Sequence, residues 1–242
     1  MIPPTSIDGT DITGATIDDT DVQEITVDGD VVFSAGPDFP LVVDDFESGN
    51  LNDYTNTSGF TISSSIVAEG SNSLELQNPA NSFDMFSDFG DGLNAYPQKG
   101  QKFSVLMYDS DVTVPNVQFG ADGGNEDGYT IADSRFGGNT ILRRLDSGNS
   151  TNLLILNTSL NDSEFYEFEV QWHDGSGSAP DNTIELTVFE IDSNLNRINT
   201  IDNGSVVDST YSSNRGVGFG DAAGNPSGDG RIDNYKIIGP VD

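Results

Sequence analysis

Short runs in which apolar and polar residues alternate make up most of the chain, and none shows the 3.6-residue period of a helix. The clearest run, residues 166–172, places its aromatic and aliphatic residues at even positions and its two Glu and one Gln at odd positions. Trp172 falls on the apolar face and is predicted to be a core residue. Many such runs, separated by turns rich in Gly, Asn, Asp and Ser, predict an all-β sandwich or jelly roll over residues 37–242.

The first 36 residues follow a different pattern, with three related copies that start ten residues apart. Each reads as apolar residue, Asp-Gly or Asp-Asp, then a second short strand. Asp-Gly favours a two-residue hairpin turn because both turn positions need a positive φ. So small a segment cannot bury a core of its own, and its apolar residues are expected to pack on a partner. The expected assembly residues are Ile7, Ile12, Ile17, Val22, Val27 and Val32.

The charge narrows the range of partners. The chain has 40 acidic and nine basic residues, a net charge of -31, and no Cys. The acids are spread among hydrophobic residues, which excludes a disordered acidic tail. Such a surface suits molar salt, where the Debye length falls to about 3 Å and self-repulsion is screened. We therefore expect a protein of a halophile. Nucleic acid and anionic membranes are excluded as partners because both require a basic patch.

The beginning and the end of the main domain carry a family likeness. Residues 44–49 read Asp-Asp-Phe-Glu-Ser-Gly, residues 70–74 read Gly-Ser-Asn-Ser-Leu, and residues 232–235 read Ile-Asp-Asn-Tyr. These motifs resemble those of concanavalin A-like, laminin-G-like and carbohydrate-binding jelly rolls, and the likeness covers residues 41–238. The resemblance implies a concanavalin A-like jelly-roll β-sandwich behind a small N-terminal β-hairpin segment. The repeats themselves resemble short hairpin repeats that serve for attachment at the N-termini of structural proteins of tailed viruses.

The same resemblance implies a structural Ca²⁺ between the first and last strands of the domain. Carried onto this sequence, its ligands are Asp45, Glu47 and Asp233, with backbone carbonyls near Gly70. Ca²⁺ takes six to eight oxygen ligands, which carboxylates and carbonyls supply. The alternative is that these three acids simply belong to the acidic surface.

A sugar-binding site would need exposed aromatic rings with polar neighbours. Four tyrosines in turn-rich contexts are the candidates: Tyr54, Tyr96, Tyr129 and Tyr211.

Signals for catalysis are weak. Glu190 and Asp192 begin the acidic pattern of jelly-roll glucanases, but the third acid is missing. A retaining glycosidase needs two carboxylates about 5–5.5 Å apart. The single histidine, His173, stands at a strand end and is expected at the surface, with no nucleophile motif to accompany it. We expect no enzymatic activity.

Together these features predict a virion structural protein of a haloarchaeal tailed virus. Residues 1–36 would dock it to other virion proteins as a homo-oligomer, in a capsid turret or spike or in a tail fibre. The domain 37–242 would face outward from the virion surface in high salt and bind host surface glycan or S-layer glycoprotein. The absence of a secretory signal at the start of the sequence favours assembly inside the cell. The alternative is a secreted carbohydrate-binding module or lectin of a halophile, which would be a monomer.

Overall fold

The structure is a computed structural model, and its elements are all β-strands. It describes residues 6–7, 10–11, 16–17, 20–21, 24–27, 30–34, 39–77, 85–88, 91–108, 115–120, 127–134, 138–146, 149–211, 216–221 and 230–241. Across these ranges there is no helix, and therefore none that could cross a membrane. The chain divides into two compact units, Met1–Phe39 and Pro40–Asp242, which are described separately.

The first unit holds three antiparallel hairpins. Their strands are β1 (Ser6–Ile7) with β2 (Thr10–Asp11), β3 (Thr16–Ile17) with β4 (Thr20–Asp21), and β5 (Glu24–Val27) with β6 (Asp30–Ser34). In the first hairpin Ile7 lies opposite Thr10, so two residues connect the strands. The other two hairpins also have two connecting residues, and the third has a register shift between Ile25 and Thr26. The hairpin segment predicted from the ten-residue repeat is thus confirmed. Of the expected assembly residues, Ile12 and Val22 lie outside the described residues.

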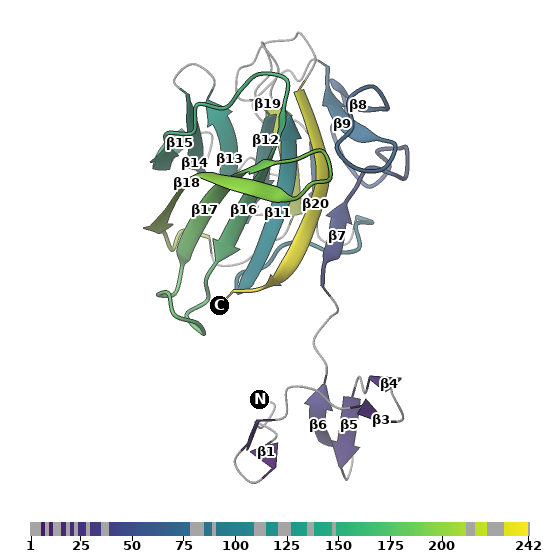
Figure 1. The fold of residues 1–242 in the computed structure, drawn as a ribbon, viewed down its shortest axis with the longest axis vertical. Helices are drawn as coiled ribbons and strands as arrows, with labels where there is room; N and C mark the ends of the chain where they lie inside the picture. The colour runs from purple at the N-terminus through teal and green to yellow at the C-terminus, as the bar shows by residue number, and fades with distance from the viewer. Residues whose placement is uncertain are drawn as a thin grey trace. The chain divides into compact units, whose positions relative to one another are not determined.

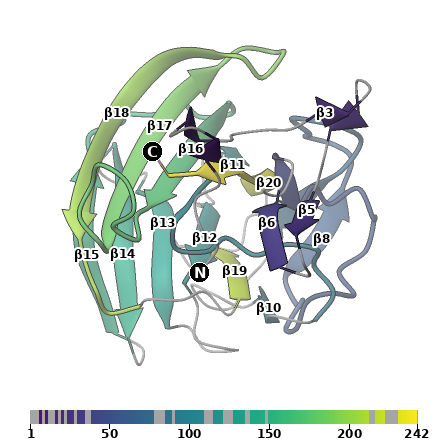
Figure 2. The same ribbon diagram turned by 90° about the horizontal axis from the view of Figure 1, so that it is seen from below.

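The second unit is a sandwich of two antiparallel sheets (Figures 1 and 2). The eight-stranded sheet has the order β18-β17-β16-β11-β20-β9-β8, with β7 also paired to β20. Its strands are β7 (Leu41–Asp44), β8 (Phe60–Ser63), β9 (Ser73–Leu76), β11 (Gln101–Tyr108), β16 (Phe165–Trp172), β17 (Thr183–Ile191), β18 (Arg197–Val207) and β20 (Gly230–Pro240).

The six-stranded sheet has the order β10-β19-β12-β13-β14-β15. Its strands are β10 (Met85–Asp88), β12 (Pro115–Phe119), β13 (Gly128–Ser134), β14 (Asn139–Asp146), β15 (Asn149–Leu156) and β19 (Gly216–Asp221). The last strand, β20, lies inside the eight-stranded sheet, hydrogen-bonded to β11 on one side and to β9 and β7 on the other. The predicted all-β sandwich is confirmed.

The core fills the space between the two sheets. Trp172 is fully buried, and its ring meets the rings of Phe119 and Tyr129 edge-on, with centroids 5.7 Å away in both cases. Phe103 from the eight-stranded sheet packs on Phe119 at 5.0 Å. Even-numbered residues of β16 therefore face inward, as the alternation in 166–172 predicts, and the core position of Trp172 is confirmed.

The outer face of the eight-stranded sheet is covered in part by the β17–β18 hairpin. In Figure 1 the start of β18, in bright green, lies across the front of the sheet. Beneath it, Glu167 and Glu169 of β16 point outward, yet they are buried. The hairpin therefore shields part of the outer face of this sheet from solvent.

Candidate functional site

A pocket opens where the tip of the β17–β18 hairpin approaches the loop between β8 and β9. Its volume is about 390 Å³. Its lining residues, which define the Phe165 pocket, are Val67, Ala68, Glu164, Phe165, Glu190, Ile191, Asp192, Ser193 and Leu195. Three segments far apart in the sequence thus build one site.

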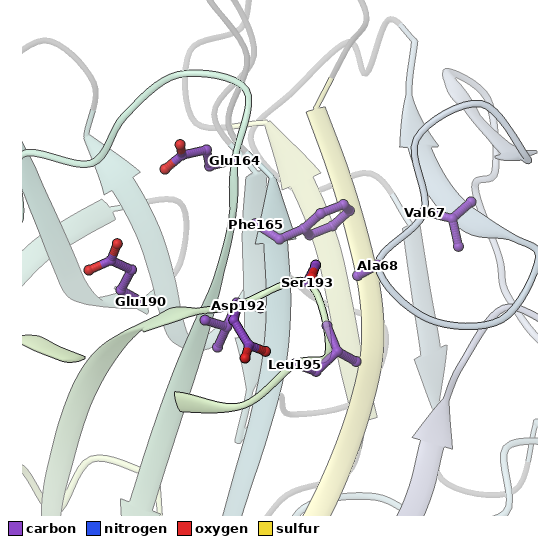
Figure 3. Close-up of a pocket in the computed structure, with 9 residues that line it drawn as sticks. Val67, Ala68, Glu164, Phe165, Glu190, Asp192, Ser193 and Leu195 are labelled. Carbon is purple, nitrogen blue, oxygen red and sulfur yellow. The ribbon is translucent and has the colours of Figure 1, made fainter. Parts of the chain in front are cut away.

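The aromatic side chain of the pocket is Phe165, the first residue of β16. Because neighbouring residues of a strand point to opposite faces, Phe165 faces outward while Tyr166 enters the core. The ring is half-buried and packs against Tyr108, with centroids 5.2 Å apart. Figure 3 shows it directed toward Ala68, with the carboxylates of Glu164 and Glu190 on the other side. The pocket therefore combines an apolar surface with carboxylate acceptors.

One wall of the pocket is held rigid by its own turn. The Oδ1 atom of Asp192 accepts the amide hydrogens of Asn194 at 2.8 Å and Asn196 at 2.9 Å. These hydrogen bonds, first the one from Asn196, lower the pKa of Asp192 below its ordinary value. Leu195 has a φ of 61°, a left-handed conformation that the turn imposes. The hairpin tip is thus preorganised, and its carboxylate stays ionised.

Arg197 holds the same hairpin to the sheet. Its Nε and Nη2 atoms donate to the two carboxylate oxygens of Glu167 at 2.7 and 2.8 Å, and Nη2 lies 2.7 Å from Glu169. The guanidinium also stacks over the ring of Phe189, 4.0 Å from its centroid. Burial alone would raise the pKa of Glu167, but the hydrogen bonds and charge of Arg197 outweigh it and lower that pKa.

The expectation that four tyrosines are exposed for sugar binding is wrong for three of them. The exposed fractions of Tyr54, Tyr96 and Tyr129 are only 8%, 6% and 0%. The Tyr54 hydroxyl donates to Asp44 Oδ2 at 2.5 Å, and the Tyr129 hydroxyl donates to Asp208 at 2.9 Å. These rings belong to the core because each hydroxyl finds a partner inside the protein, so a ring next to a turn need not be exposed.

Tyr211 is half-buried and serves the same internal cluster. Its ring packs edge-on against Tyr129, with centroids 5.3 Å apart, and its hydroxyl donates to the carbonyl of Leu145. It therefore pins the segment after β18 to the six-stranded sheet. The structure does not bring the four tyrosines together as an open surface.

Two of the three expected Ca²⁺ ligands bind the same loop, between β8 and β9. Glu47 Oε1 accepts the amides of Ser71 and Asn72 at 2.8 and 2.7 Å, while Asp233 Oδ2 accepts the amide of Ala68 at 2.9 Å. Asp233 is fully buried, and its Oδ1 atom has no hydrogen-bond partner. Burial raises the pKa of Asp233 to about 6, and the charge of Glu47 adds to the shift.

The third expected ligand, Asp45, is used differently: its Oδ1 accepts the amide of Glu47 at 3.1 Å. In the part of the chain that the structure describes, no group of three or more Asp, Glu, His or Cys is arranged to hold a metal ion. The loop nonetheless packs tightly against Glu47. A Cβ on Gly70, whose φ is +72°, would lie 2.5 Å from Glu47 Oε1. The unpartnered Oδ1 of Asp233 fits a cation completed by backbone oxygens.

His173 also departs from expectation, because it is 2% exposed and not a surface residue. Its Nε2 atom lies 3.5 Å from Glu185.

Glu190 and Asp192, the two acids that begin the glucanase pattern, both line the Phe165 pocket. Phe165 was not predicted from the sequence, although the alternation in β16 offers the signal: it places one aromatic ring on an otherwise polar face.

Comparison with known proteins identifies the fold. No protein-family model and no curated protein matches the sequence. Among solved structures, the carbohydrate-binding module CBM66 from Bacillus subtilis matches with a TM-score of 0.53 at 12% identity, over 78% of this chain and 97% of that one. A protein of unknown function from Shewanella oneidensis MR-1 matches with a TM-score of 0.50 at 11% identity, over 84% and 85% of the two chains.

The xylan β-1,4-xylosidase from Bacillus halodurans C-125 matches with a TM-score of 0.51 at 12% identity, over 86% of this chain and 40% of that one. At such identities these likenesses establish the shared β-sandwich fold and nothing further.

Proposed function

We propose that the sandwich is a glycan-binding head and that its Phe165 pocket takes a sugar residue. The observation that carries the proposal is the composition of that pocket. Phe165 offers an apolar ring, while Glu164, Glu190 and Asp192 offer carboxylate oxygens beside it. A sugar has both an apolar ring face and hydroxyl donors, so it matches both parts of the lining. The volume of about 390 Å³ falls within the range of small-ligand sites.

Two further observations support this assignment. The hairpin tip that forms one wall is preorganised by Asp192 and held down by Arg197, which reduces the entropy lost on binding. The fold is also shared with a protein named as a carbohydrate-binding module.

The head is proposed to bind without cleaving. A glycosidase needs a carboxylic acid that is protonated near neutral pH, together with a second carboxylate. Asp192 cannot be that acid, because the amides of its own turn keep it ionised. An assay for newly formed reducing ends tests this point, and release that disappears in Glu190→Gln and Asp192→Asn would overturn it.

The larger role that we propose is that of a virion structural protein of a haloarchaeal tailed virus. The hairpins of residues 1–36 would dock to other virion proteins in a capsid turret, a spike or a tail fibre, and join copies of the chain. Many copies on one particle would raise avidity for host surface glycan or S-layer glycoprotein without new contacts. The three repeated hairpins and the net charge of -31 support this role. The second candidate is a secreted lectin of a halophile.

Glu47 and Asp233 are proposed to hold a structural Ca²⁺ through their remaining carboxylate oxygens. The ion would neutralise the buried charge of Asp233 and fix β20 to the loop that supplies Ala68 to the pocket. It would serve stability and play no part in sugar chemistry.

The direct test of sugar binding is a screen of immobilised neutral and acidic glycans in about 2–3 M salt, the range that suits this charge. A glycan bound by the native chain should lose at least tenfold in affinity with Phe165→Ala. Tyr54→Phe is the matched control, since that ring is buried, and its affinity should not change. If Phe165→Ala binds the glycan as tightly as the native chain, the Phe165 pocket is not the sugar-binding site.

A further inference from the structure

A second pocket lies at the free edge of the eight-stranded sheet, beside β8. Its volume is about 380 Å³, close to that of the Phe165 pocket. Its walls are the loop of residues 49–52, Thr57 and residues 60–62 of β8, which together define the β8 pocket. None of the described residues that line it is charged, although the chain has 40 acidic residues. The β8 pocket therefore differs in chemistry from the Phe165 pocket, which has three carboxylates.

Three polar side chains of the β8 pocket have hydrogen-bonding groups that the protein does not use. They are the amide of Asn52 and the hydroxyls of Thr57 and Thr61. Within the described part of the chain, none of these side chains forms a hydrogen bond. Asn52 is exposed, and the two threonines are half-buried, so a ligand in the pocket can reach all three. The pocket thus presents accessible donors and acceptors on one surface.

The backbone of β8 adds a further donor and acceptor, because β8 is the last strand of its sheet and pairs only with β9. The N–H of Gln77 donates to the carbonyl of Gly59 at 2.8 Å. Hydrogen-bonded and non-bonded pairs alternate along an antiparallel ladder, so Phe60 and Ile62 direct their backbone groups away from β9. The N–H of Phe60 accordingly donates to the carbonyl of Thr57 at 3.1 Å. The N–H and C=O of Ile62 therefore face the open edge, beside the pocket.

The loop that forms the other wall is fixed by its own hydrogen bonds. The backbone N–H of Asn52 donates to Asn50 Oδ1 at 3.0 Å, and Asn50 Nδ2 donates to the carbonyl of Ser48 at 3.2 Å. The N–H of Tyr54 then donates to the carbonyl of Leu51 at 3.2 Å. Leu51 is half-buried and places an apolar side chain among the polar groups of the pocket. Because the wall is already ordered, less entropy is lost when a ligand binds.

We propose that the β8 pocket is a second sugar-binding site and that it takes a neutral sugar residue. The amide of Asn52 can serve two neighbouring sugar hydroxyls, since its C=O accepts from one and its NH₂ donates to the other. The hydroxyls of Thr57 and Thr61 and the backbone of Ile62 supply further partners. Leu51 suits the apolar C–H face of the sugar ring. An uncharged lining offers no ion pair to an acidic sugar or an amino sugar, so a neutral sugar fits it best.

The second site rests on the proposed glycan-binding role and gives each head two places of attachment. The ring of Phe60 is only 7% exposed, so the described lining of the β8 pocket has no open aromatic surface. We therefore expect the β8 pocket to bind more weakly than the Phe165 pocket. Two sites on one head would raise the avidity for a neutral polysaccharide even in a single copy of the chain.

The test is an NMR titration of the full chain in about 2–3 M salt. The probes are short neutral oligosaccharides of glucose, galactose, mannose and xylose, with an oligo-galacturonate as the acidic comparison. The backbone N–H of Ile62 reports on the β8 pocket and that of Ala68 on the Phe165 pocket, and a neutral probe should shift both signals. Loss of one neutral hydrogen bond weakens binding about twofold to tenfold, so Asn52→Ala with Thr61→Val should weaken it at Ile62 by about tenfold or more. The melting temperature should not change, because neither side chain has a partner in the described protein.

Asn199→Ala is the matched control, since Asn199 is an exposed asparagine of β18 outside both pockets, and it should bind like the native chain. Phe165→Ala should keep the shift at Ile62 and lose the shift at Ala68. A shift at Ala68 alone leaves the Phe165 pocket in place and overturns the β8 site, as does unchanged affinity at Ile62 in the double variant. A shift at Ile62 alone supports the β8 site and contradicts the Phe165 pocket. If no neutral probe binds, both assignments fail, and oligo-galacturonate that binds at Ile62 as tightly as the neutral probes overturns the choice of a neutral sugar.

Discussion

Arg197 binds both carboxylate oxygens of Glu167, although a whole strand, β17, lies between the two strands that carry these residues. The link spans the outer face of the sheet and keeps the β17–β18 hairpin folded over it. The hairpin tip in turn supplies four residues to the wall of the Phe165 pocket, counting from Ile191. The geometry of the proposed sugar site therefore depends on an ion pair outside it.

Replacement of Arg197 by Met should destabilise the fold and loosen the pocket. It leaves Glu167 and Glu169 buried without their cation, and we expect a loss of about 2 kcal/mol, below that of a fully buried pair because Arg197 is partly exposed. Urea unfolding at fixed salt measures this loss, and hydrogen exchange at residues 192–196 should quicken. Arg197→Lys keeps the charge and should lose less. Unchanged exchange in Arg197→Met would show that the tip is held by its own turn alone.

The buried carboxyl of Asp233 should make stability depend on pH. Its pKa rises to about 6 on folding, so the protonated form is favoured in the folded state. This contribution is fully present below about pH 4 and is lost as the pH rises through 6, which is worth about 2–3 kcal/mol. Thermal unfolding in a chelator should show the decline, and Asp233→Asn should remove that part of it. A variant with the native pH profile would contradict the assignment.

At neutral pH, bound Ca²⁺ should restore the stability that protonation of Asp233 supplies at low pH. At a concentration one hundred times its dissociation constant, the ion should add about 2.7 kcal/mol to the free energy of unfolding at pH 7. The increase should vanish in Asp233→Asn and in Glu47→Gln, while Asp45→Asn should keep most of it, because Asp45 caps its own turn. Titration followed by melting temperature measures the effect. An increase that depends on Asp45 alone would contradict this ligand set.

Tyr129→Phe should affect stability and leave sugar binding intact. The hydroxyl of Tyr129 donates to Asp208 and accepts the amide of Tyr211, so its removal takes one donor from Asp208 and leaves the buried end of that amide without this acceptor. We expect a loss of about 1–2 kcal/mol in denaturant unfolding. If the variant is as stable as the native chain but no longer binds glycan, Tyr129 takes part in glycan binding and this prediction is wrong.

Removal of residues 1–36 should convert an oligomer to a monomer without unfolding the head. The sandwich forms a compact unit of its own from Pro40 onward, so its melting temperature should be unchanged. Light scattering in about 2–3 M salt compares the two chains. If the full chain is itself a monomer, the secreted lectin becomes the better assignment.

Strand alternation and turn composition were sufficient to predict the architecture, but they did not predict the site. The alternation in 166–172 placed Trp172 in the core because burial in a strand follows a two-residue period. Tyr129 was misjudged because its hydroxyl partner, Asp208, is 79 residues away in the sequence. The Phe165 pocket needs three distant segments to meet, and local patterns carry no information on such contacts.

The position of β20 has a consequence for how the protein is made. This strand comes after all the others in the sequence, yet it lies between β11 and β9 within its sheet. The sheet cannot close while residues 230–240 are still inside the ribosome, so the head folds only after these residues have emerged from it. Pairings this distant in the sequence also form slowly. Until then one edge of β11 and one edge of β9 stay without the strand that pairs with them in the finished sheet.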